Sequence, residues 1–518
     1  MALAPILVLL ALMLGLKWSA PKAAPAALLV AVAVALTTYR SSPLLVVLES
    51  LKGVWSSLTV VLVIFTALIL YELSNQAKAF ATIQPAITKI ASNELVRILG
   101  IGLVLVSFLQ GVTGFGVPVA VCAPLLISIG VKPLWAVIIP LTGHAWAGTF
   151  GTLALAWNAL VVQSGLSGTD AVLTTALFAT FFLLIVNVFS GLFICFAYGR
   201  WEGVRKGLVP VLILTGLQGG GQILFAQLNP TLACFVPSCF ALLGFLAIGK
   251  LQKTPWSLPH SPIMQPRQEV AGSQAVPNMH LADTFLPYII LTVLTLLVLL
   301  SPLQGTLGQL QFGFAFPETS TGLGYLNSAS DRYAPFSPLT HASAFLLLAA
   351  IISYAYYRKQ GFLAADSARS ILGQATRKAV PSSIAVISLM TMARVMGGSG
   401  QITVMATFTS AAFANTYGLF TPLIGLLGTF ITGSNMSSNV LFAEFQMQTA
   451  QLLSLNPAVI LAVQTAAGSI GTSISPSNIV LGVTTAGIMG SEGNILKRIL
   501  PLALLLTALF GVAAWLIA

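Results

Sequence analysis

Two short polar runs near the C-terminal end carry the side chains best suited to binding a small ligand. The runs are 432–439 (TGSNMSSN) and 471–478 (GTSISPSN), and both lie inside sequence that is otherwise apolar enough for a bilayer. Non-helical backbone at membrane depth is tolerated only where it packs in protein or lines a cavity. The runs therefore predict a binding site built from interrupted helices. The structural alternative is close packing of small residues between helices, but packing does not require three asparagines.

Three ionisable residues fall at the expected depth of the membrane: Arg394, Glu444 and His144. An arginine at a helix centre costs about 2.5–3.5 kcal/mol on insertion scales, which predicts an anionic partner for Arg394, either a bound carboxylate or Glu444. An interfacial arginine at the end of a span is the alternative. Glu444 is the first candidate for a transferred proton, because a buried carboxyl group can take up a proton near neutral pH. A static ion pair is its alternative. His144 is the second candidate, since imidazole titrates in this range, although a lone histidine is more often structural.

The composition places these residues in a polytopic helical membrane protein. Of the 518 residues, 57% are hydrophobic and only 7% are charged, whereas about a quarter of an ordinary soluble domain is charged. The net charge of +11 is spread over short loops, which indicates that it sets the orientation of the protein in the membrane. It does not indicate a nucleic-acid-binding surface. No CxxC pair, HExxH, GxSxG or P-loop motif occurs, and we expect no metal, no cofactor and no enzymatic role. The isolated cysteines are expected to be small core residues; they are Cys122, Cys195, Cys234 and Cys239.

Apolar runs of spanning length recur along the chain. The expected spans are 3–16, 23–39, 54–71, 95 to a break at 110–118, 171–198, 207–226, 231–249, 284–301, 342–357, 380–396, 402–417 and 499–518. The segment 43–52 carries Glu49 and Lys52, and we expect an interfacial helix whose charges reach water in preference to a buried pair.

The hydrophilic connections complete the expected organisation. Residues 74–93 and the basic stretch 358–378 are expected at the membrane surface, and 250–282 and 302–340 are expected to be loops. Basic residues cluster near 200–206, 250–267, 358–378 and 497–498, so the positive-inside rule leaves 302–340 outside. We expect a single transmembrane domain over 1–518. It divides into an N-terminal region 1–200 with a broken segment at 110–152, the loop 250–282, and a C-terminal region 283–518 with a broken segment at 430–482.

The two broken segments repeat the same order of parts. In the first, Gly114 and Gly116 precede an apolar run, Pro133 opens the next helix, and a second break follows at Gly148-Thr149. The second has Gly433-Ser434-Asn435, then Pro457, then Gly471-Thr472. Paired breaks in corresponding positions are the best sequence pointer to a transporter built from repeats. Coincidence in a glycine-rich chain is the alternative.

Three segments resemble the signature regions of the L-lactate permease family: 114–126 (GFGVPVAVCAPLL), 432–450 (TGSNMSSNVLFAEFQMQTA) and 471–493 (GTSISPSNIVLGVTTAGIMGSEG). The resemblance is strong over 430–500, clear at 110–135 and weak elsewhere. It implies an inner-membrane carrier for lactate or glycolate that works as a proton symporter. The pattern is also similar to a wider ion-transporter superfamily, which implies two inverted repeats with re-entrant hairpins and broken helices, elevator-type movement and, as an option, a homodimer.

The sequence departs from the family pattern at the expected site. Family members commonly have an acidic residue where Gln110 stands and an Asn-Thr-Ala-Pro-like run where residues 143–146 stand, and threonine is usual at Met436. These departures leave the exact substrate and the coupling ion open, but they do not change the prediction that the protein is a carrier.

A hydroxy-carboxylate needs hydrogen-bond donors for its carboxylate, a partner for its hydroxyl group and an apolar wall for its methyl group. Helix N-termini present free N–H groups and partial positive charge, and half-helices starting after Gly116, Ser438 and Pro476 would supply them. The predicted binding residues are Thr113, Gly114, Gly116, Ser434, Asn435, Ser437, Ser438, Asn439, Ser475, Ser477, Asn478 and Arg394. The partners expected are a small carboxylate, protons and the lipid bilayer. Sodium coupling is the runner-up, because unwound tips with free carbonyls also suit Na⁺, and an anion channel is a third reading.

Overall fold

The computed structural model describes residues 1–114, 116–251, 256–258, 260–265, 279–300, 302–364 and 366–518. Within these residues, ten helices are long and apolar enough to cross a membrane. The predicted polytopic helical class is therefore confirmed. Most of the predicted loop 250–282 lies outside the described residues.

The N-terminal half contains twelve α-helices and several short π- and 3₁₀-turns. The helices are α1 (Ala4–Leu10), α2 (Ala20–Thr37), α3 (Pro43–Gln76), α4 (Ile83–Ile90), α5 (Glu94–Leu99), α6 (Val106–Val112), α7 (Val117–Ser128), α8 (Pro133–Gly143), α9 (Gly151–Ser164), α10 (Thr169–Thr215), α11 (Gly221–Leu228) and α12 (Phe235–Leu251). The short turns are η1 (Ala11–Gly15), η2 (Ala79–Thr82), η3 (Gly100–Leu105), η4 (Ala145–Ala147), η5 (Gly216–Gly220) and η6 (Pro230–Leu232).

The C-terminal half adds ten helices, one short turn and four strands. The helices are α13 (Leu281–Leu299), α14 (Leu303–Leu307), α15 (Ala342–Lys359), α16 (Ser367–Gly398), α17 (Gln401–Phe413), α18 (Tyr417–Thr432), α19 (Asn435–Leu452), α20 (Pro457–Ile474), α21 (Pro476–Thr485) and α22 (Glu492–Ile517). The turn is η7 (Ala414–Thr416), and the strands are β1 (Phe312–Phe316), β2 (Thr319–Ser320), β3 (Leu326–Asn327) and β4 (Ser330–Phe336).

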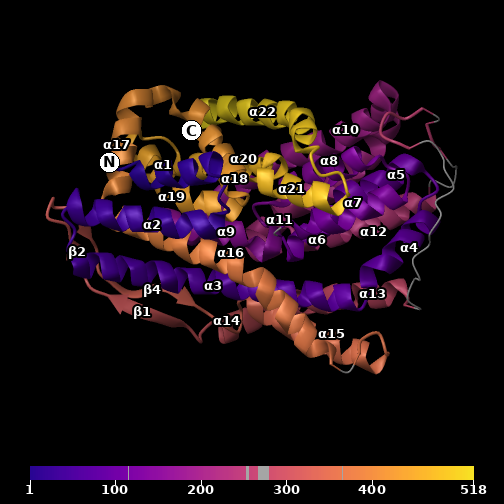
Figure 1. Ribbon diagram of the computed structural model, residues 1–518, viewed down its shortest axis with the longest axis horizontal. Coiled ribbons are helices and arrows are strands. Elements are labelled where there is room, and N and C mark those ends of the chain that lie inside the picture. Colours follow the sequence, from indigo (N-terminus) through magenta and orange to yellow (C-terminus); the bar gives the residue numbers. More distant parts are fainter. Residues whose placement is uncertain (115, 252–255, 259, 266–278, 301, 365) are drawn as a thin grey trace.

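The helices form two packed groups. Helix α16 packs along α2 and α3, and α15 joins them through α3 and α13. The second group has α18, α19, α20 and α22 at its centre, with α10 against α20 and α9 against α19. The strands lie at one end of the molecule, and α4 and α5 lie at the other (Figure 1). The groups meet mainly where α16 reaches α19 and α3 reaches α9.

The segment 302–340 was predicted as a loop and instead contains one short helix and four strands. β1 pairs antiparallel with β4, and β2 pairs with β3. The alternation Phe312, Phe314, Phe316 is a strand signal that explains β1. The indole of Trp55 in α3 donates to the carbonyls of Tyr333 and Ala334 at 3.2 and 3.1 Å, so this β-layer is tied to the start of α3.

Several predicted boundaries are wrong in the same direction, because helices run further than their apolar cores. Residues 43–52 and 54–71 form one helix, α3, which Ser42 caps and Pro43 opens. Helix α16 begins at Ser367, inside the predicted connector 358–378, and α22 begins at Glu492. The predicted gap between the spans 171–198 and 207–226 contains a break in α10 at Gly199-Arg200, but the helix resumes directly after it and not at 207.

Glu49 and Lys52 form a buried ion pair, so the predicted interfacial arrangement is wrong. The side chain of Glu49 is fully buried, and its Oε1 lies 2.6 Å from Nζ of Lys52. Its Oε2 accepts from Arg394 in the last turns of α16 at 3.0 Å. The β-layer shields this cluster, because the rings of Phe316 and Tyr333 lie 5.3 and 5.7 Å from Nζ of Lys52. The sequence could not show this cover, since it comes from a segment nearly 300 residues away.

Glu49→Gln is expected to lower the free energy of unfolding by about 3–5 kcal/mol, because it removes the negative partner shared by the buried Lys52 and the partly buried Arg394. Thermal unfolding of the purified protein in detergent measures the loss. Glu318→Gln, at an exposed carboxylate of the β-layer, is the matched control. Equal unfolding temperatures for the two variants would show that the cluster contributes nothing to stability.

Candidate functional site

The first break separates α6 from α7. Helix α6 ends at Val112, and Gly114 and Gly116 have φ of +58° and +79° before α7 begins at Val117. Only glycine adopts this region without strain, which is why the chain can stop and restart here. Thr113 is fully buried and donates to the carbonyl of Leu109 at 2.8 Å, so its hydroxyl closes the end of α6.

The second break lies between α8 and α9. The segment Pro133–Ala147 meets Gly151–Ser164 at 52°. Thr152, Leu153 and Ala154 carry positive φ, which is costly for residues with a Cβ atom. Strain held at one point by the surrounding fold is typical of a functional site.

The third break is the tip between α18 and α19. Gly433 ends α18 with φ +76°, the usual left-handed C-terminal cap. Ser434 caps α19 by accepting from the N–H of Ser437. The helix thus begins at Asn435, one turn earlier than the start after Ser438 that was predicted. Ser437 and Ser438 consequently lie in the first turn and not in an extended loop.

The fourth break separates α20 from α21. Ser475 caps α21 through the N–H of Asn478, and Pro476 opens the helix, as predicted. The side-chain amide of Asn478 donates to the carbonyl of Thr472 at 2.9 Å, which satisfies one of the free carbonyls at the end of α20.

The four breaks converge on one cavity of about 60 Å³. From the N-terminal half it is lined by Gln110, Gly116, His144, Gly148, Gly151, Thr152, Leu155 and Ala156. From the C-terminal half it is lined by Gly433, Ser434, Asn435, Met436, Thr472 and Asn478. Chain segments more than 300 residues apart therefore share a single polar space.

Asparagines of α19 connect the two halves beside this cavity. Nδ2 of Asn435 donates to the carbonyl of Thr465 in α20 at 3.0 Å and to Oγ1 of Thr149 at 3.3 Å. One turn further along, Nδ2 of Asn439 donates to the carbonyl of Ala156 at 2.9 Å. The space for Asn435 exists because Gly468 has no side chain: a methyl group there would lie 2.1 Å from Oδ1 of Asn435. The Asn435 side chain holds the tip against the first-half break.

Of the fourteen residues predicted for binding or proton transfer, five line the cavity. They are Gly116, His144, Ser434, Asn435 and Asn478. Gly114 lies directly behind its wall, since a methyl group there would lie 2.3 Å from Oγ1 of Thr152. Ser438 donates to the carbonyl of Gly425 at 3.0 Å and so serves the packing of α19 on α18. Ser475 and Ser477 lie at the start of α21, where a methyl group on Gly433 would overlap Oγ of Ser477.

Arg394 and Glu444 lie in the charged cluster with Glu49 and are not among the cavity-lining residues. Arg394 is 3.0 Å from Glu49 and 3.9 Å from Glu444. Its guanidinium also lies 5.6 Å from the ring of Tyr333. Gly397 permits the approach of Glu444, because a methyl group there would lie 2.5 Å from Oε2. Glu444 was one of the two partners predicted for Arg394, but the closer carboxylate is Glu49, which was not predicted.

Sequence reasoning missed several lining residues, of which Gln110 is the most informative. It lies in the last turn of α6, and a methyl group on Gly151 would lie 3.1 Å from its Nε2. A glutamine in an otherwise apolar span directly before a Gly-rich break was the available signal. Met436 and Thr472 lie in the two polar runs noted in the sequence, whereas Thr152 carried no distinguishing signal, because threonine is common in helical cores.

The cavity is polar and carries no fixed side-chain charge. Lys, Arg, Asp and Glu are absent from its described lining, and His144 is its ionisable group. Nδ1 of His144 lies 2.5 Å from the carbonyl of Pro140. A carbonyl only accepts, so Nδ1 carries the hydrogen and Nε2 remains to bind a proton. The starts of α7 and α19 and the first turn of α21 contribute Gly116, Ser434 and Asn478, so partial positive charge from helix N-termini favours a small anion here.

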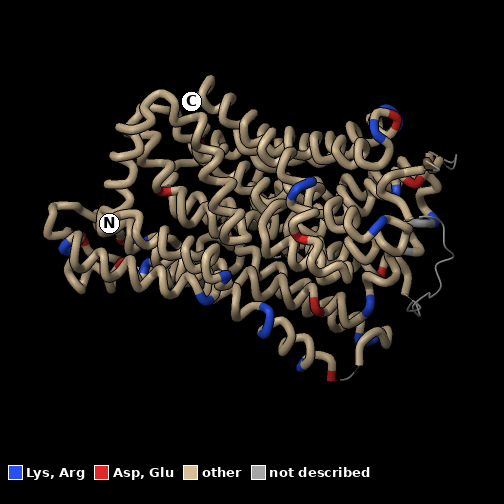
Figure 2. Tube along the Cα trace, turned by 45° about the horizontal axis from the view of Figure 1, so that its top comes forward, with Lys and Arg blue, Asp and Glu red and all other residues tan. Residues whose placement is uncertain are grey.

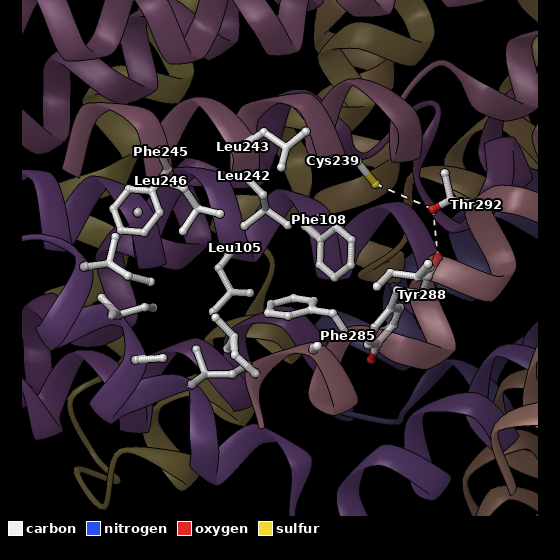
Figure 3. A pocket seen from close by; sticks show the side chains of 18 of the residues that line it. Leu105, Phe108, Cys239, Leu242, Leu243, Phe245, Leu246, Phe285, Tyr288 and Thr292 are labelled. Carbon is white, nitrogen blue, oxygen red and sulfur yellow. Dashed lines mark hydrogen bonds between the residues drawn. The ribbon is translucent and has the colours of Figure 1, made fainter. Parts of the chain in front are cut away.

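A larger cavity of about 420 Å³ lies elsewhere, between α4, α6, α12 and α13. Figure 3 shows its wall of Leu, Phe and Tyr side chains, with Phe108, Phe285 and Tyr288 facing its interior. The side chains of Cys239 and Thr292 form a hydrogen bond with each other at its edge. An apolar wall of this kind offers no set of donors to hold a carboxylate, so it is not the anion site.

Comparisons with known proteins relate the chain to a family of permeases. The family model for L-lactate permease matches residues 1–518. The L-lactate permease of Halalkalibacterium halodurans is 25% identical, with 87% of this chain and 82% of that protein covered. The glycolate permease GlcA of Escherichia coli is 24% identical, with 89% and 84% covered. The solved YdaH transporter of Alcanivorax borkumensis is 13% identical with a TM-score of 0.46, covering 89% of this chain and 85% of that one.

The family match extends over the whole chain, and it agrees with the ten apolar helices and the polar breaks between them. It also confirms the resemblance drawn from the three signature segments. This chain belongs to the L-lactate permease family and is a multi-pass transporter of the bacterial inner membrane.

Proposed function

We propose that this chain carries a short 2-hydroxy monocarboxylate, such as L-lactate or glycolate, across the inner membrane together with protons. The observation that supports this most directly is the uncharged polar cavity at which helix N-termini from both halves meet. Its volume of about 60 Å³ suits a solute of a few heavy atoms, whereas drug-sized ligands need roughly 300–1,000 Å³. Relatives named L-lactate permease and glycolate permease point to the same size class.

The carboxylate is proposed to bind at the start of α19. The N–H groups of Asn435 and Met436 lie in the first turn, where no intrahelical acceptor exists, and the hydroxyl of Ser434 is beside them. Gln110 and Thr152 face them from the other half and supply amide and hydroxyl groups for the substrate hydroxyl. Leu155, Ala156 and Met436 form the apolar wall for a methyl group.

The proton is proposed to bind Nε2 of His144. A protonated imidazole in the cavity wall would neutralise the substrate carboxylate, so proton and substrate would each favour binding of the other. Glu444 is the alternative carrier, and it lies beside Arg394 and not in the cavity wall. Sodium coupling remains the runner-up mechanism, because unwound helix ends also expose carbonyl oxygens.

The movement is proposed to be of the elevator type between the two helix groups. Supporting this, all four breaks belong to segments α6–α9 and α18–α21, while α2, α3, α15 and α16 form a separate packed layer. The broken segments 110–152 and 430–482 would be the corresponding parts of two inverted repeats within one domain over 1–518. A homodimer is compatible with this scheme, and an anion channel would instead require a continuous pore.

Proteoliposomes containing the purified protein test the proposal. An inward proton gradient without sodium is expected to drive accumulation of labelled L-lactate, and unlabelled glycolate should compete better than succinate. If accumulation requires a sodium gradient and does not depend on the pH gradient, the coupling ion is Na⁺ and not the proton. Ionic currents that do not saturate with substrate would indicate a channel.

A further inference from the structure

A basic cavity lies apart from the substrate site, where α8 begins, α10 bends and α22 begins. It measures about 570 Å³. Its wall carries four cationic side chains, which are Lys132, Arg200, Lys497 and Arg498. No acidic residue is found in its described lining, and Trp135, Phe193 and Pro501 are among the apolar residues that complete it.

The four cations lack carboxylate partners within the part of the chain that the structure describes. Arg498 lies over the ring of Trp135 at 5.0 Å, and Arg200 lies over the ring of Phe196 at 5.2 Å. Lys132 donates to the carbonyl of Pro262 at 2.7 Å. Aromatic rings and a carbonyl orient the cations but leave their charges in place, so the four like charges favour binding of an anion.

The backbone bends sharply at this cavity. Arg200 has φ +52° and ψ −138°, and the preceding Gly199 is also non-helical, which breaks α10 at this point. A positive φ at a residue with a long side chain is strained and persists only where the surroundings hold it. The bend brings Arg200 to the same cavity as Lys497 and Arg498 from α22. Figure 2 shows that charged residues are sparse along the chain and that most of the molecule carries none.

The surroundings of the cavity belong to the membrane boundary. Both α10 and α22 contribute candidate membrane spans. Pro501 lines the cavity, and Leu504 and Leu505, one turn further along α22, are exposed by 47% and 49%. An apolar surface that faces lipid therefore begins where the cationic wall ends. By the positive-inside rule, the basic clusters at 200–206 and 497–498 face the cytoplasm.

We infer that this cavity binds the phosphate group of an anionic phospholipid from the inner leaflet. Arginine and lysine side chains bind phosphate oxygens through charge-assisted hydrogen bonds. Basic pockets between membrane helices on the cytoplasmic side are the usual place for such headgroups. Trp135 and Phe193 supply an apolar face for the glycerol backbone and the first acyl carbons, which a free phosphate ion would not use. The inference does not depend on the substrate or on the coupling ion.

The test compares ligands on the full-length protein purified in a neutral detergent. Phosphatidylglycerol is expected to raise the thermal unfolding temperature and to remain bound in native mass spectrometry, whereas phosphatidylcholine should do neither. A further sample with inorganic phosphate alone distinguishes a lipid headgroup from a free phosphate ion as the ligand. If it protects the protein as well as phosphatidylglycerol does, the site is one for soluble phosphate, and the lipid assignment is overturned.

The double variant Lys497→Gln/Arg498→Gln localises the effect. It is expected to weaken binding of phosphatidylglycerol roughly 30-fold, since each surface cation contributes about a fivefold factor to anionic lipid binding. Arg205→Gln/Lys206→Gln is the matched control: it removes the same charge from an exposed pair just beyond the α10 bend, outside the cavity lining. Equal weakening in both double variants, or none in either, would overturn the assignment to this cavity. Exchange of labelled for unlabelled lactate by the double variant in phosphatidylcholine proteoliposomes reports separately on the substrate site.

Discussion

Asn435→Ala is expected to lower lactate uptake by about 10- to 100-fold, mostly through a higher KM. The substitution removes the amide that bonds Thr465 and Thr149, so the first turn of α19 loses its attachment to the opposite half of the cavity. A buried polar group left without its partner costs about 1–3 kcal/mol, and 1.4 kcal/mol corresponds to a factor of ten in affinity. Initial rates in proteoliposomes at several lactate concentrations separate KM from the maximal rate.

Asn439→Ala is the matched control for this prediction. Asn439 is equally buried, lies one turn further along α19 and bonds Ala156 and Thr465, but it does not line the cavity. Both variants should lose comparable thermal stability, whereas only Asn435→Ala should raise KM strongly. The same increase in both variants would show that general loosening of α19 is responsible. Near-normal uptake by Asn435→Ala would remove this residue from the site.

His144→Gln is expected to retain exchange of labelled for unlabelled lactate and to lose accumulation driven by a pH gradient. Glutamine keeps a hydrogen-bonding side chain in the cavity wall but cannot take up a proton at Nε2. Without that proton, substrate movement is no longer linked to the proton gradient, so accumulation should fall to the equilibrium level. The two assays use the same proteoliposomes with and without an imposed gradient.

Glu444→Gln completes the test of coupling. Glu444 is the other titratable candidate, but Arg394 lies 3.9 Å from it, and it lies outside the cavity lining. With His144 as the carrier, Glu444→Gln should still accumulate lactate. The reverse pattern, in which Glu444→Gln loses accumulation and His144→Gln keeps it, would assign the proton to Glu444. Loss of both exchange and accumulation in His144→Gln would mean that the residue serves the shape of the cavity and not the coupling.

The charged cluster shows how far apolar periodicity can mislead. Glu49 and Lys52 interrupt an apolar run, and from sequence this favours charges that reach water at an interface. Their burial depends on Arg394 from α16 and on the rings of Phe316 and Tyr333 from the β-layer. Those partners lie more than 250 residues away in the chain, and nothing in a single sequence shows that they contact α3. The same reason explains why the basic cavity between α8, α10 and α22 was not foreseen.

The sequence by itself determined the class, the family and the four places near the cavity where helices are broken. Gly114, Gly116 and Gly433 act locally, because they adopt positive φ, which ends a helix. Ser475 and Pro476 also act locally, because Ser475 caps the helix that Pro476 opens. Only the tertiary structure decided which of the polar groups share a space. It brought Gln110 and His144 to the start of α19 and turned Ser438 toward α18, because side-chain direction depends on where each helix begins and what it packs against. A start at Asn435 instead of one turn later was enough to change which hydroxyl groups face the cavity.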